Sequence, residues 1–229
     1  MAFDHLAFDI ETIPLKDLSE YGSAIQQKLT EKIERLQDRN PDYDYNYFAS
    51  IHGDFSKIIC ISMGYLTEKG DIKLKSLYGE DESKILKEFN SIIKTFRGVF
   101  IHYNGLNFDV PTILQRMSHH LIRPSNKNFT FLRRFTTDPH FDLMMQYYNW
   151  DWQKILPLGI LAELHSVPSP KEDLDGSEIF ETYKRGEWER LVHYCEFDVA
   201  TTLNLWNKIY RHKPVIPENK YIFSEIDAK

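Results

Sequence analysis

The chain has 229 residues, enough for one α/β domain, and 42% of them are hydrophobic and 14% aromatic. This composition is ordinary for a globular protein and excludes a largely disordered chain. The formal net charge of −6 argues mildly against nucleic-acid binding, because phosphate affinity comes mainly from lysine and arginine, but acidic residues gathered at a cation site would also lower the total.

Targeting and redox signals are weak in this sequence. No stretch approaches the roughly 18 apolar residues of a membrane span, and the N-terminus carries acidic residues where a signal peptide would be basic. We therefore expect a cytoplasmic protein without a membrane partner. Cys60 and Cys195 lack the C-x-x-C spacing of a zinc or redox site, so we expect two buried free thiols.

The first hundred residues alternate between strand and helix patterns, which are distinguished by hydrophobic periods of 2.0 and 3.6 residues. In chain order, the predicted elements are a buried strand over 6–10, an amphipathic helix over 19–39, a surface loop over 42–47, a hairpin of strands over 57–65 and 72–77, a helix over 81–96 and a strand over 98–102. Thr12-Ile13-Pro14 is expected to end the first strand.

The second half of the sequence is mainly helical by pattern. Predicted helices cover 110–117, 142–148, 155–165, 177–185 and 187–210. Strands followed by helices, with one strand between them, predict an α/β fold with a mixed sheet flanked by helices. We expect one domain over 1–229, with a core over about 3–210 and a surface-lying tail over 211–229.

Two acidic residues lie at the end of the first predicted strand. Asp9 and Glu11 are two residues apart, so strand periodicity directs both side chains to the same face. Two carboxylates so placed repel each other unless a cation lies between them. Such a pair also occurs as solvated charge at a strand end, so alone it is weak evidence for a metal site.

A second acidic position follows the strand predicted over 98–102. The segment YNGLNFD passes through a glycine turn and ends at Asp109, where a helix is expected to begin. An aspartate at a helix start is also a common N-cap. These residues therefore leave both a capping role and a metal-binding role open for Asp109.

The third acidic position lies inside the long C-terminal helix, in the segment YCEFD. Tyr194 and Asp198 are four residues apart and share one helix face, and Asp198 stands in an apolar stretch that is costly for an unpaired carboxylate. His193 is an alternative partner, but it lies about 140° from Asp198 around the helix axis, against about 40° for Tyr194. The geometry favours Tyr194 and places His193 on the outer face.

The segments FDIET, YNGLNFD and YCEFD, in this order and spacing, resemble the three exonuclease motifs of the DEDD superfamily in its tyrosine (DEDDy) variant. The second motif and its continuation VPTIL resemble the proofreading domain of family B DNA polymerases. The chain as a whole resembles stand-alone 3′→5′ exonucleases related to that domain. This resemblance implies a ribonuclease H-like mixed β-sheet flanked by helices.

The resemblance also implies roles for the motif residues. Asp9, Glu11 and Asp198 are expected to bind one Mg²⁺ or Mn²⁺ ion, Asp9 to reach a second ion, and Asp109 to assist through water. Tyr194 is expected to orient the attacking water. The chemistry fits independently, because these ions prefer hard oxygen ligands and two of them can stabilise the attacking and leaving oxygens of phosphodiester hydrolysis.

The segment over 110–137 contains no acidic residue and interleaves basic with aromatic side chains. Its basic residues include Arg116, Arg123, Lys127, Arg133 and Arg134. Such a segment can bind phosphates and stack unpaired bases, and a solvated loop whose phenylalanines enter the core explains it about as well. Arg133 and Arg134 are our candidate substrate contacts within it.

Further candidate contacts to the terminal nucleotide come from the motif positions of the resemblance. They are Thr12, Asn104 and Phe108, and core packing explains Phe108 equally well. The histidines at positions 102, 119, 120 and 140 have no recognisable metal-ligand spacing and are left outside the site.

The expected function is therefore metal-dependent 3′→5′ exonuclease activity on single-stranded DNA, releasing nucleoside 5′-monophosphates. DNA is favoured because of the resemblance to a proofreading domain. An RNA 3′→5′ exonuclease would use the same carboxylates. A catalytically inert nucleic-acid-binding protein of the same fold and a phosphatase acting on small nucleotides are the remaining alternatives.

Overall fold

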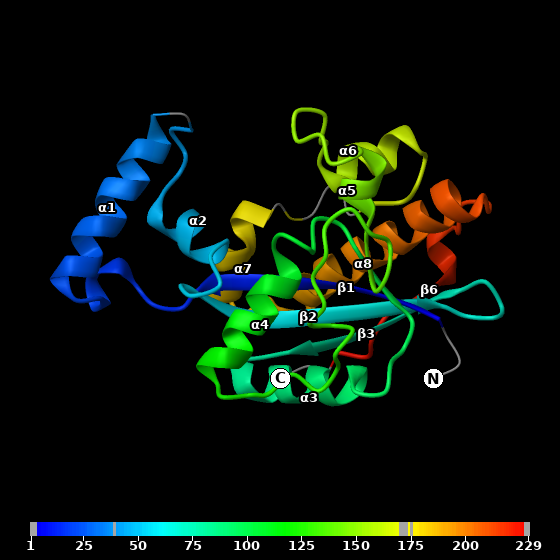
Figure 1. Cartoon of the computed structure of the whole chain (residues 1–229), viewed down its shortest axis with the longest axis horizontal. Coiled ribbons are helices and arrows are strands. Elements are labelled where there is room, and N and C mark those ends of the chain that lie inside the picture. Colours follow the sequence, from blue (N-terminus) through cyan, green and yellow to red (C-terminus); the bar gives the residue numbers. More distant parts are fainter. Residues whose placement is uncertain (1–3, 39, 170–173, 175, 227–229) are drawn as a thin grey trace.

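A mixed sheet forms the centre of the computed structural model, which describes residues 4–38, 40–169, 174 and 176–226 (Figure 1). Within these residues the sheet has six strands in the order β5-β4-β1-β2-β3-β6. The strands are β1 (His5–Pro14), β2 (Ser56–Leu66), β3 (Ile72–Tyr78), β4 (Val99–His102), β5 (His140–Asp142) and β6 (Tyr221–Ile222). β1 pairs antiparallel with β2 and parallel with β4, so the expected mixed sheet is confirmed.

Helices lie on both faces of this sheet (Figure 1). They are α1 (Ser23–Gln37), α2 (Tyr45–Ser50), α3 (Glu82–Ile93), α4 (Asp109–His119), α5 (Leu143–Tyr147), α6 (Leu158–Leu164), α7 (Ile179–Lys184) and α8 (Trp188–Arg211). Short 3-10 turns cover Leu18–Glu20, Gly176–Glu178 and Glu218–Lys220. Among the described residues, none of the helices combines the length and apolar character needed to cross a membrane.

Alternate residues of β1 enter two different cores. Leu6, Phe8 and Ile10 pack with α3 and α4 on one face, where Phe8 lies edge-on to Phe100 with ring centroids 6.0 Å apart. Ala7 packs with α8 on the opposite face. Because side chains alternate along a strand, Asp9 and Glu11 share the face of Ala7 and are directed toward α8. The two-residue period of β1 thus sets the direction of both motif carboxylates.

The first strand is longer than expected. Thr12, Ile13 and Pro14 continue the pairing with β2 instead of ending it, after a register shift between Glu11 and Thr12. A proline is tolerated there because β4 pairs with β1 only as far as Ala7, so the other edge of β1 requires no N–H group from Pro14. The predicted end at Thr12-Ile13-Pro14 was wrong for this reason.

The loop expected over 42–47 is also wrong in its last residues. Helix α2 begins at Tyr45, where Asp44 acts as N-cap and accepts a 2.7 Å hydrogen bond from the Tyr47 amide. Phe48 and Ala49 of this helix are buried. A local cap and two buried side chains therefore convert part of the expected loop into a helix.

Two short strands were not predicted. β5 covers His140–Asp142, three buried residues beside β4, and β6 covers Tyr221–Ile222 within the expected tail. Strands of three and two residues carry too little periodicity to be recognised from sequence. These residues become strands because β5 hydrogen-bonds to β4 and β6 to β3.

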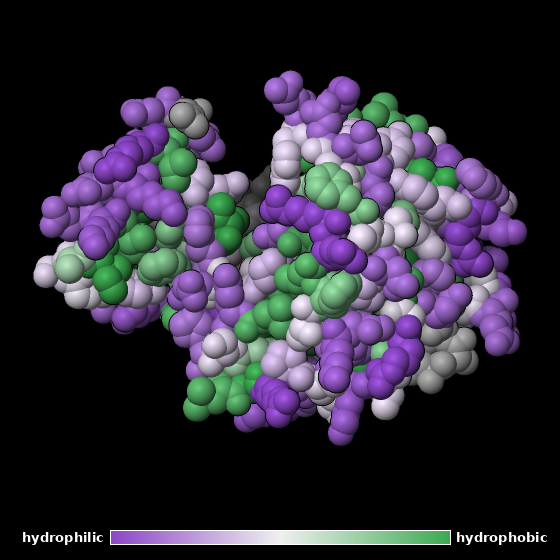
Figure 2. Space-filling view, viewed as in Figure 1, coloured by the Kyte–Doolittle hydropathy of each residue, from purple (hydrophilic) through white to green (hydrophobic). Residues whose placement is uncertain are grey.

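Helices α1 and α2 form an arm that projects from one end of the sheet (Figure 1). Leu29, Ile33 and Phe48 form a small core of their own within it. Figure 2 shows a hollow between the arm and the rest of the visible surface. The Thr12 hydroxyl donates a 2.7 Å hydrogen bond to the carbonyl of Ser50, which ties the arm to β1.

Candidate active site

Four motif carboxylates from three separate segments meet at one place. Asp9 and Glu11 come from β1, Asp109 from the first turn of α4, and Asp198 from the middle of α8. Burial raises the pKa of Asp9 well above its ordinary value, and the charges of Asp109, Glu11 and Asp198 raise it further. Carboxylates act on one another in this way only at short range, so the fold gathers the residues of all three motifs.

Asp109 is positioned by a gap in the sheet. β4 pairs with β1 only through Ala7, which leaves the Ile10 amide without a strand partner on that edge. One carboxylate oxygen of Asp109 accepts a 3.2 Å hydrogen bond from this amide. The N-cap of α4 is Phe108, and Asp109 is the first helical residue. The capping role left open for Asp109 is therefore not the one found.

The electrostatics of this cluster are dominated by burial and like charge. Glu11 is 8% exposed, and the pKa of its carboxyl is raised by burial and by Asp198, Cys60 and Asp109, which are all acidic groups. Burial also raises the pKa of Asp109 and of Asp198 to about 7. Such a group is short of positive charge, and oxygen ligands alone suit Mg²⁺ or Mn²⁺.

Tyr194 and His193 lie on different sides of α8. A hydrogen bond from Tyr194 opposes the effect of burial on the pKa of Asp198, so this phenol contacts the acidic cluster. His193 is exposed and stacks on Phe223, with ring centroids 4.6 Å apart and planes 24° apart. This arrangement matches the helical geometry expected from the spacing of the third motif.

Asp142 is a residue of this region that sequence reasoning missed. One of its carboxylate oxygens accepts a 3.0 Å hydrogen bond from the Asn104 amide, and the other accepts a 3.0 Å bond from the Leu106 amide. It also caps α5 through the Met145 amide at 3.2 Å. Asp142 therefore fixes the loop that leads to Asp109. The signal was an aspartate at the first position of the predicted helix over 142–148.

Backbone conformation explains two further residues of the same loop. Asn104 has a φ of 69°, in the left-handed region that asparagine tolerates better than most residues. A Cβ on Gly105 would lie 2.4 Å from the ring of His102, so only glycine fits there. The YNGL part of the second motif is thus required by the turn itself.

The histidines left outside the site have structural partners. His102 Nε2 lies 3.2 Å from His140 Nδ1, and His140 Nε2 lies 3.0 Å from the carbonyl of Phe129. His140 therefore donates to that carbonyl and accepts from His102, and burial lowers its pKa to about 3. His119 pairs with Asp54 on the surface, and His120 with Glu82.

Arg116 does not belong with the exposed basic residues of its segment. It is 3% exposed and forms two hydrogen bonds to Glu82, from Nε at 2.9 Å and from Nη2 at 2.7 Å. The Ile58 amide donates a third bond to Glu82, at 2.7 Å. Arg116 thus fastens α4 to α3 and β2, and its inclusion among the basic residues available to a phosphate was wrong.

The candidate substrate contacts have different surroundings. The Thr12 hydroxyl donates to Ser50, the Asn104 side-chain oxygen accepts from Asn107 at 3.0 Å, and Phe108 packs against the α3 and α4 core. Arg133 and Arg134 are exposed. Their roles toward a substrate stay predictions.

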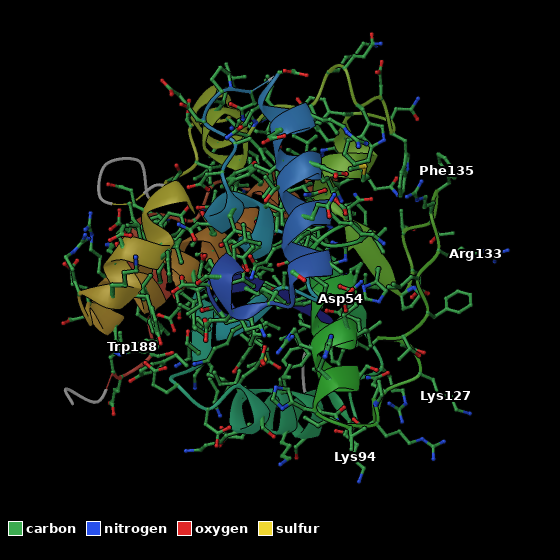
Figure 3. The ribbon with its side chains drawn as sticks, turned by 90° about the vertical axis from the view of Figure 1, so that its left-hand side faces the viewer. Asp54, Lys94, Lys127, Arg133, Phe135 and Trp188 are labelled. Atoms are coloured by element: carbon green, nitrogen blue, oxygen red, sulfur yellow. The ribbon has the colours of Figure 1, made fainter. Side chains whose placement is uncertain are left out.

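The aromatic residues of the basic segment divide between core and surface. Phe129 is fully buried, whereas Phe131 is 52% exposed and Phe135 is 74% exposed. Phe135 lies against Trp150 with ring centroids 4.6 Å apart. Figure 3 shows Lys127, Arg133 and Phe135 along one edge of the molecule. Part of this segment therefore presents aromatic and basic groups to solvent.

A comparison with known protein families identifies the family to which this chain belongs. Residues 48–228 match a family described as predicted 3′-5′ exonucleases related to the exonuclease domain of PolB. The chain belongs to this family. The matched range includes the second and third motifs and starts after Asp9 and Glu11, which the fold joins to the same cluster. A comparison with curated proteins gave no match.

Solved structures show where this fold occurs. The family B DNA polymerase of the hyperthermophilic archaeon Pyrobaculum calidifontis is 18% identical, with a TM-score of 0.61, over 92% of this chain and 25% of the polymerase. E. coli exonuclease I in complex with a dT13 oligonucleotide is 11% identical, with a TM-score of 0.46, over 91% of this chain and 41% of that chain. The chain thus spans a quarter of the polymerase, whose fold it shares in that part.

Proposed function

We propose that the protein is a divalent-cation-dependent 3′→5′ exonuclease that acts on single-stranded DNA and releases nucleoside 5′-monophosphates. The observation that carries this proposal is the meeting of four buried acidic side chains from three separate segments of a chain that belongs to a 3′-5′ exonuclease family. The relation of this family to the exonuclease domain of PolB favours DNA.

The residues of the cluster fit a pair of hard divalent cations. Asp9, Glu11, Asp109 and Asp198 would hold them, since burial raises the pKa of every one of these carboxyls and repulsion from other motif carboxylates raises the pKa of Asp9, Glu11 and Asp198 further. Two Mg²⁺ or Mn²⁺ ions bound there would supply the Lewis acidity that stabilises charge on the attacking and leaving oxygens of a phosphodiester.

Tyr194 is proposed to orient the attacking water. Its hydroxyl contacts Asp198, and Asp198 belongs to the cluster. A phenol with an ordinary pKa of about 10 acts at neutral pH as a hydrogen-bond donor and not as a general base. Tyr194 therefore positions a water molecule and does not remove its proton.

The exposed part of the basic segment is proposed to contact the strand that enters the site. Arg133 and Arg134 would bind phosphates, and Phe131 and Phe135 would stack unpaired bases. Support comes from the exposure of both phenylalanines in the same segment as the two exposed arginines.

The test is digestion of a 5′-labelled single-stranded DNA, beside the matching RNA, with Mg²⁺ or Mn²⁺ and with a chelator. We expect a metal-dependent ladder of one-nucleotide steps that retains the 5′ label, with mononucleotides as product. Asp9→Asn and Asp198→Asn should abolish it. Glu189→Gln is the matched control, because Glu189 lies on the same helix, α8, and is exposed.

Each other outcome points to a defined alternative. Faster digestion of RNA would assign the enzyme to RNA 3′ ends. Metal-dependent binding without digestion of either strand would indicate an inert binding protein, and hydrolysis of mononucleotides alone would indicate a small-molecule phosphatase. A ladder that survives Asp198→Asn would overturn the assignment of the site.

A further inference from the structure

One stretch of the chain is almost free of acidic residues. Residues 89–137 contain a single acid, Asp109 of the acidic cluster, although Asp and Glu make up 34 of the 229 residues. Figure 3 shows Lys94 and Lys127 in the lower right of the view, below Arg133 and Phe135. The exposed cations of the first part of this stretch form what we call the cationic corner, which consists of Lys94, Arg97, Arg123 and Lys127. It is a positive surface on a chain whose formal net charge is −6.

Hydrogen bonds hold the two halves of the cationic corner together. Asn90, near the end of α3, donates from Nδ2 to the carbonyl of Arg123 at 3.0 Å. Asn126 is 2% exposed, and its Nδ2 donates to the carbonyls of Ile93 and Phe96 at 2.6 and 2.9 Å. The loop that follows α4 is therefore fixed against the end of α3, although the two segments are about thirty residues apart in the sequence.

The chain supplies no counter-charge to the cationic corner. Among the described residues, none of its four cations forms an ion pair. Other surface cations do, such as Lys57 with Glu80 at 3.0 Å and Lys184 with Glu181 at 2.8 Å. The four positive charges are therefore available to an anion from outside the chain.

The dipole of α3 explains only half of this charge. Cations are favoured at the C-terminal end of a helix, and Lys94 and Arg97 follow the last residue of α3. Arg97 Nη1 also donates to the Phe96 carbonyl at 2.9 Å. Arg123 and Lys127, in contrast, lie outside the described helices. Their position beside two further cations is explained better by a partner with several negative charges.

The aromatic residues near these cations distinguish paired from unpaired nucleic acid. Phe89, Phe96 and Phe129 are all buried, so these rings cannot stack on a base. Phe131 and Phe135, further along the same segment, are exposed. Single strands bind through stacked bases as well as phosphates, whereas a duplex keeps its bases stacked inside and presents its phosphates. The cationic corner therefore suits a duplex backbone, and residues 131–135 suit an unpaired strand.

Helix α4 sets the separation between the cationic corner and the acidic cluster. Asp109 begins this helix and His119 ends it, so it spans about 15 Å at about 1.5 Å per residue. Arg123 follows four residues later. One strand of B-DNA advances about 3.4 Å per nucleotide, so about 15 Å corresponds to about four or five nucleotides.

We infer that the cationic corner binds the phosphate backbone of a DNA duplex, one strand of which continues as an unpaired 3′ tail toward the acidic cluster. The preferred substrate is then a duplex with a 3′ tail of about five nucleotides and not an entirely unpaired strand. The position of the 3′ end rests on the proposed function, and the binding of a duplex by the cationic corner does not. Contacts to phosphates alone make this binding independent of base sequence.

The test is fluorescence anisotropy of the full-length chain in a chelator, which prevents digestion of metal-dependent substrates. The labelled DNAs are a hairpin duplex with a 3′ tail of about five nucleotides, the tail alone, and an unpaired strand with as many phosphates as the tailed hairpin. We expect the unaltered protein to bind the tailed hairpin at least about tenfold more tightly than either unpaired DNA.

The double variant Lys94→Gln/Lys127→Gln should weaken binding of the tailed hairpin at least about tenfold and change binding of the tail alone less than about twofold. The slope of log affinity against log salt should become shallower by about 1.8, because each lost phosphate contact contributes about 0.9. Lys184→Gln/Lys213→Gln is the matched control, since it removes the same charge from exposed residues outside 89–137. It should bind all three DNAs as the unaltered protein does.

Equal losses in the two double variants, or unchanged binding by Lys94→Gln/Lys127→Gln, overturn the inference. It is also overturned if the unpaired strand of equal charge binds as tightly as the tailed hairpin. Binding of polyglutamate through Lys94 and Lys127, with no binding of DNA, would assign the surface to an acidic protein instead. If the tailed hairpin binds through the cationic corner but no DNA is digested, only the proposed function fails. If DNA is digested and the double variant binds normally, only this inference fails.

Discussion

Two groups of buried carboxylates in this protein differ in their partners and not in their depth. Glu82 is 5% exposed and Glu11 is 8% exposed. Burial alone would raise the pKa of Glu82, but hydrogen bonds from Arg116, the Ile58 amide and His120 lower it below its usual value. Burial raises the pKa of Glu11, and its acidic neighbours raise it further. The chain thus neutralises the carboxyl of Glu82 and not that of Glu11.

This difference separates a structural role from a functional one. Glu82 and Arg116 join α3, α4 and β2, and nothing remains for a ligand to complete. Asp142 is similar, because the nearby His102, whose Nδ1 lies 3.5 Å from Oδ2, and hydrogen bonds from backbone amides lower its pKa against the effect of burial. Burial and acidic neighbours instead raise the pKa values of Asp9 and Glu11, which creates a demand for positive charge that a ligand can meet. Burial of an acid alone therefore does not identify a site.

The largest expected effect comes from breaking the buried ion pair between Arg116 and Glu82. Arg116→Met leaves Glu82 buried with less positive charge and should lower the free energy of unfolding by about 3–5 kcal/mol, measured by urea denaturation. Adding Glu82→Leu should recover part of this loss, because an apolar pair needs no neutralisation. If Arg116→Met alone is as stable as the unaltered protein, Arg116 is not needed to neutralise Glu82.

A second effect concerns the histidine beside Asp142. The folded-state pKa of His140 is about 3, against an ordinary value of about 6.5, so the unfolded chain binds the proton more readily. This contribution to stability is present above pH 6.5 and is lost as pH falls toward 3. Between pH 6.5 and pH 4.5 it should lower the free energy of unfolding by about 2 kcal/mol.

The variant that tests this pH dependence is His140→Phe, because a phenylalanine keeps an aromatic ring stacked on Phe100 (ring centroids 5.2 Å apart for His140) and cannot bind a proton. Its stability should fall less steeply over the same pH range in urea denaturation. His102 and Asp142 face His140 and remain in both proteins, so their effects largely cancel. Equal slopes for His140→Phe and the unaltered chain would contradict the assignment.

A third prediction concerns the charge of the acidic cluster formed by Asp9, Glu11, Asp109 and Asp198. In a chelator at pH 8, Asp198→Asn should raise the free energy of unfolding by about 1–2 kcal/mol, because it removes one charge from the cluster. Mg²⁺ at about 100 times its Kd should stabilise the unaltered protein by about 2.7 kcal/mol and the variant by less. Thermal unfolding measures both changes. Destabilisation of the metal-free protein by Asp198→Asn would mean that the cluster is neutralised by the chain after all.

The smallest expected effect separates two neighbouring residues of α8. Tyr194→Phe removes the hydroxyl that contacts Asp198 and should lower the nuclease rate about 10–100-fold, as partners of metal ligands commonly do. His193→Gln alters an exposed side chain stacked on Phe223 and should leave the rate within about twofold. The opposite ranking would assign the motif to its histidine variant.

The sequence predicted the main strands and helices and the set of acidic residues, because each carries a local signal. The period of two in β1 directs Asp9 and Glu11 to one face, and a spacing of four unites Tyr194 with Asp198 in α8. Asp142 was missed because the amides that it binds lie 38 and 36 residues earlier in the chain. Arg116 was misjudged because its partner Glu82 is 34 residues away.

By itself, the sequence therefore determined which residues share a strand or helix face and the order of the three motifs. The tertiary structure alone decided which acids are neutralised. Glu82 meets Arg116, and Asp109 reaches the unpaired edge of β1 at Ile10. The physical reason is that periodicity is a property of neighbouring residues, whereas the charge state of a buried acid depends on groups that only folding brings within a few ångströms.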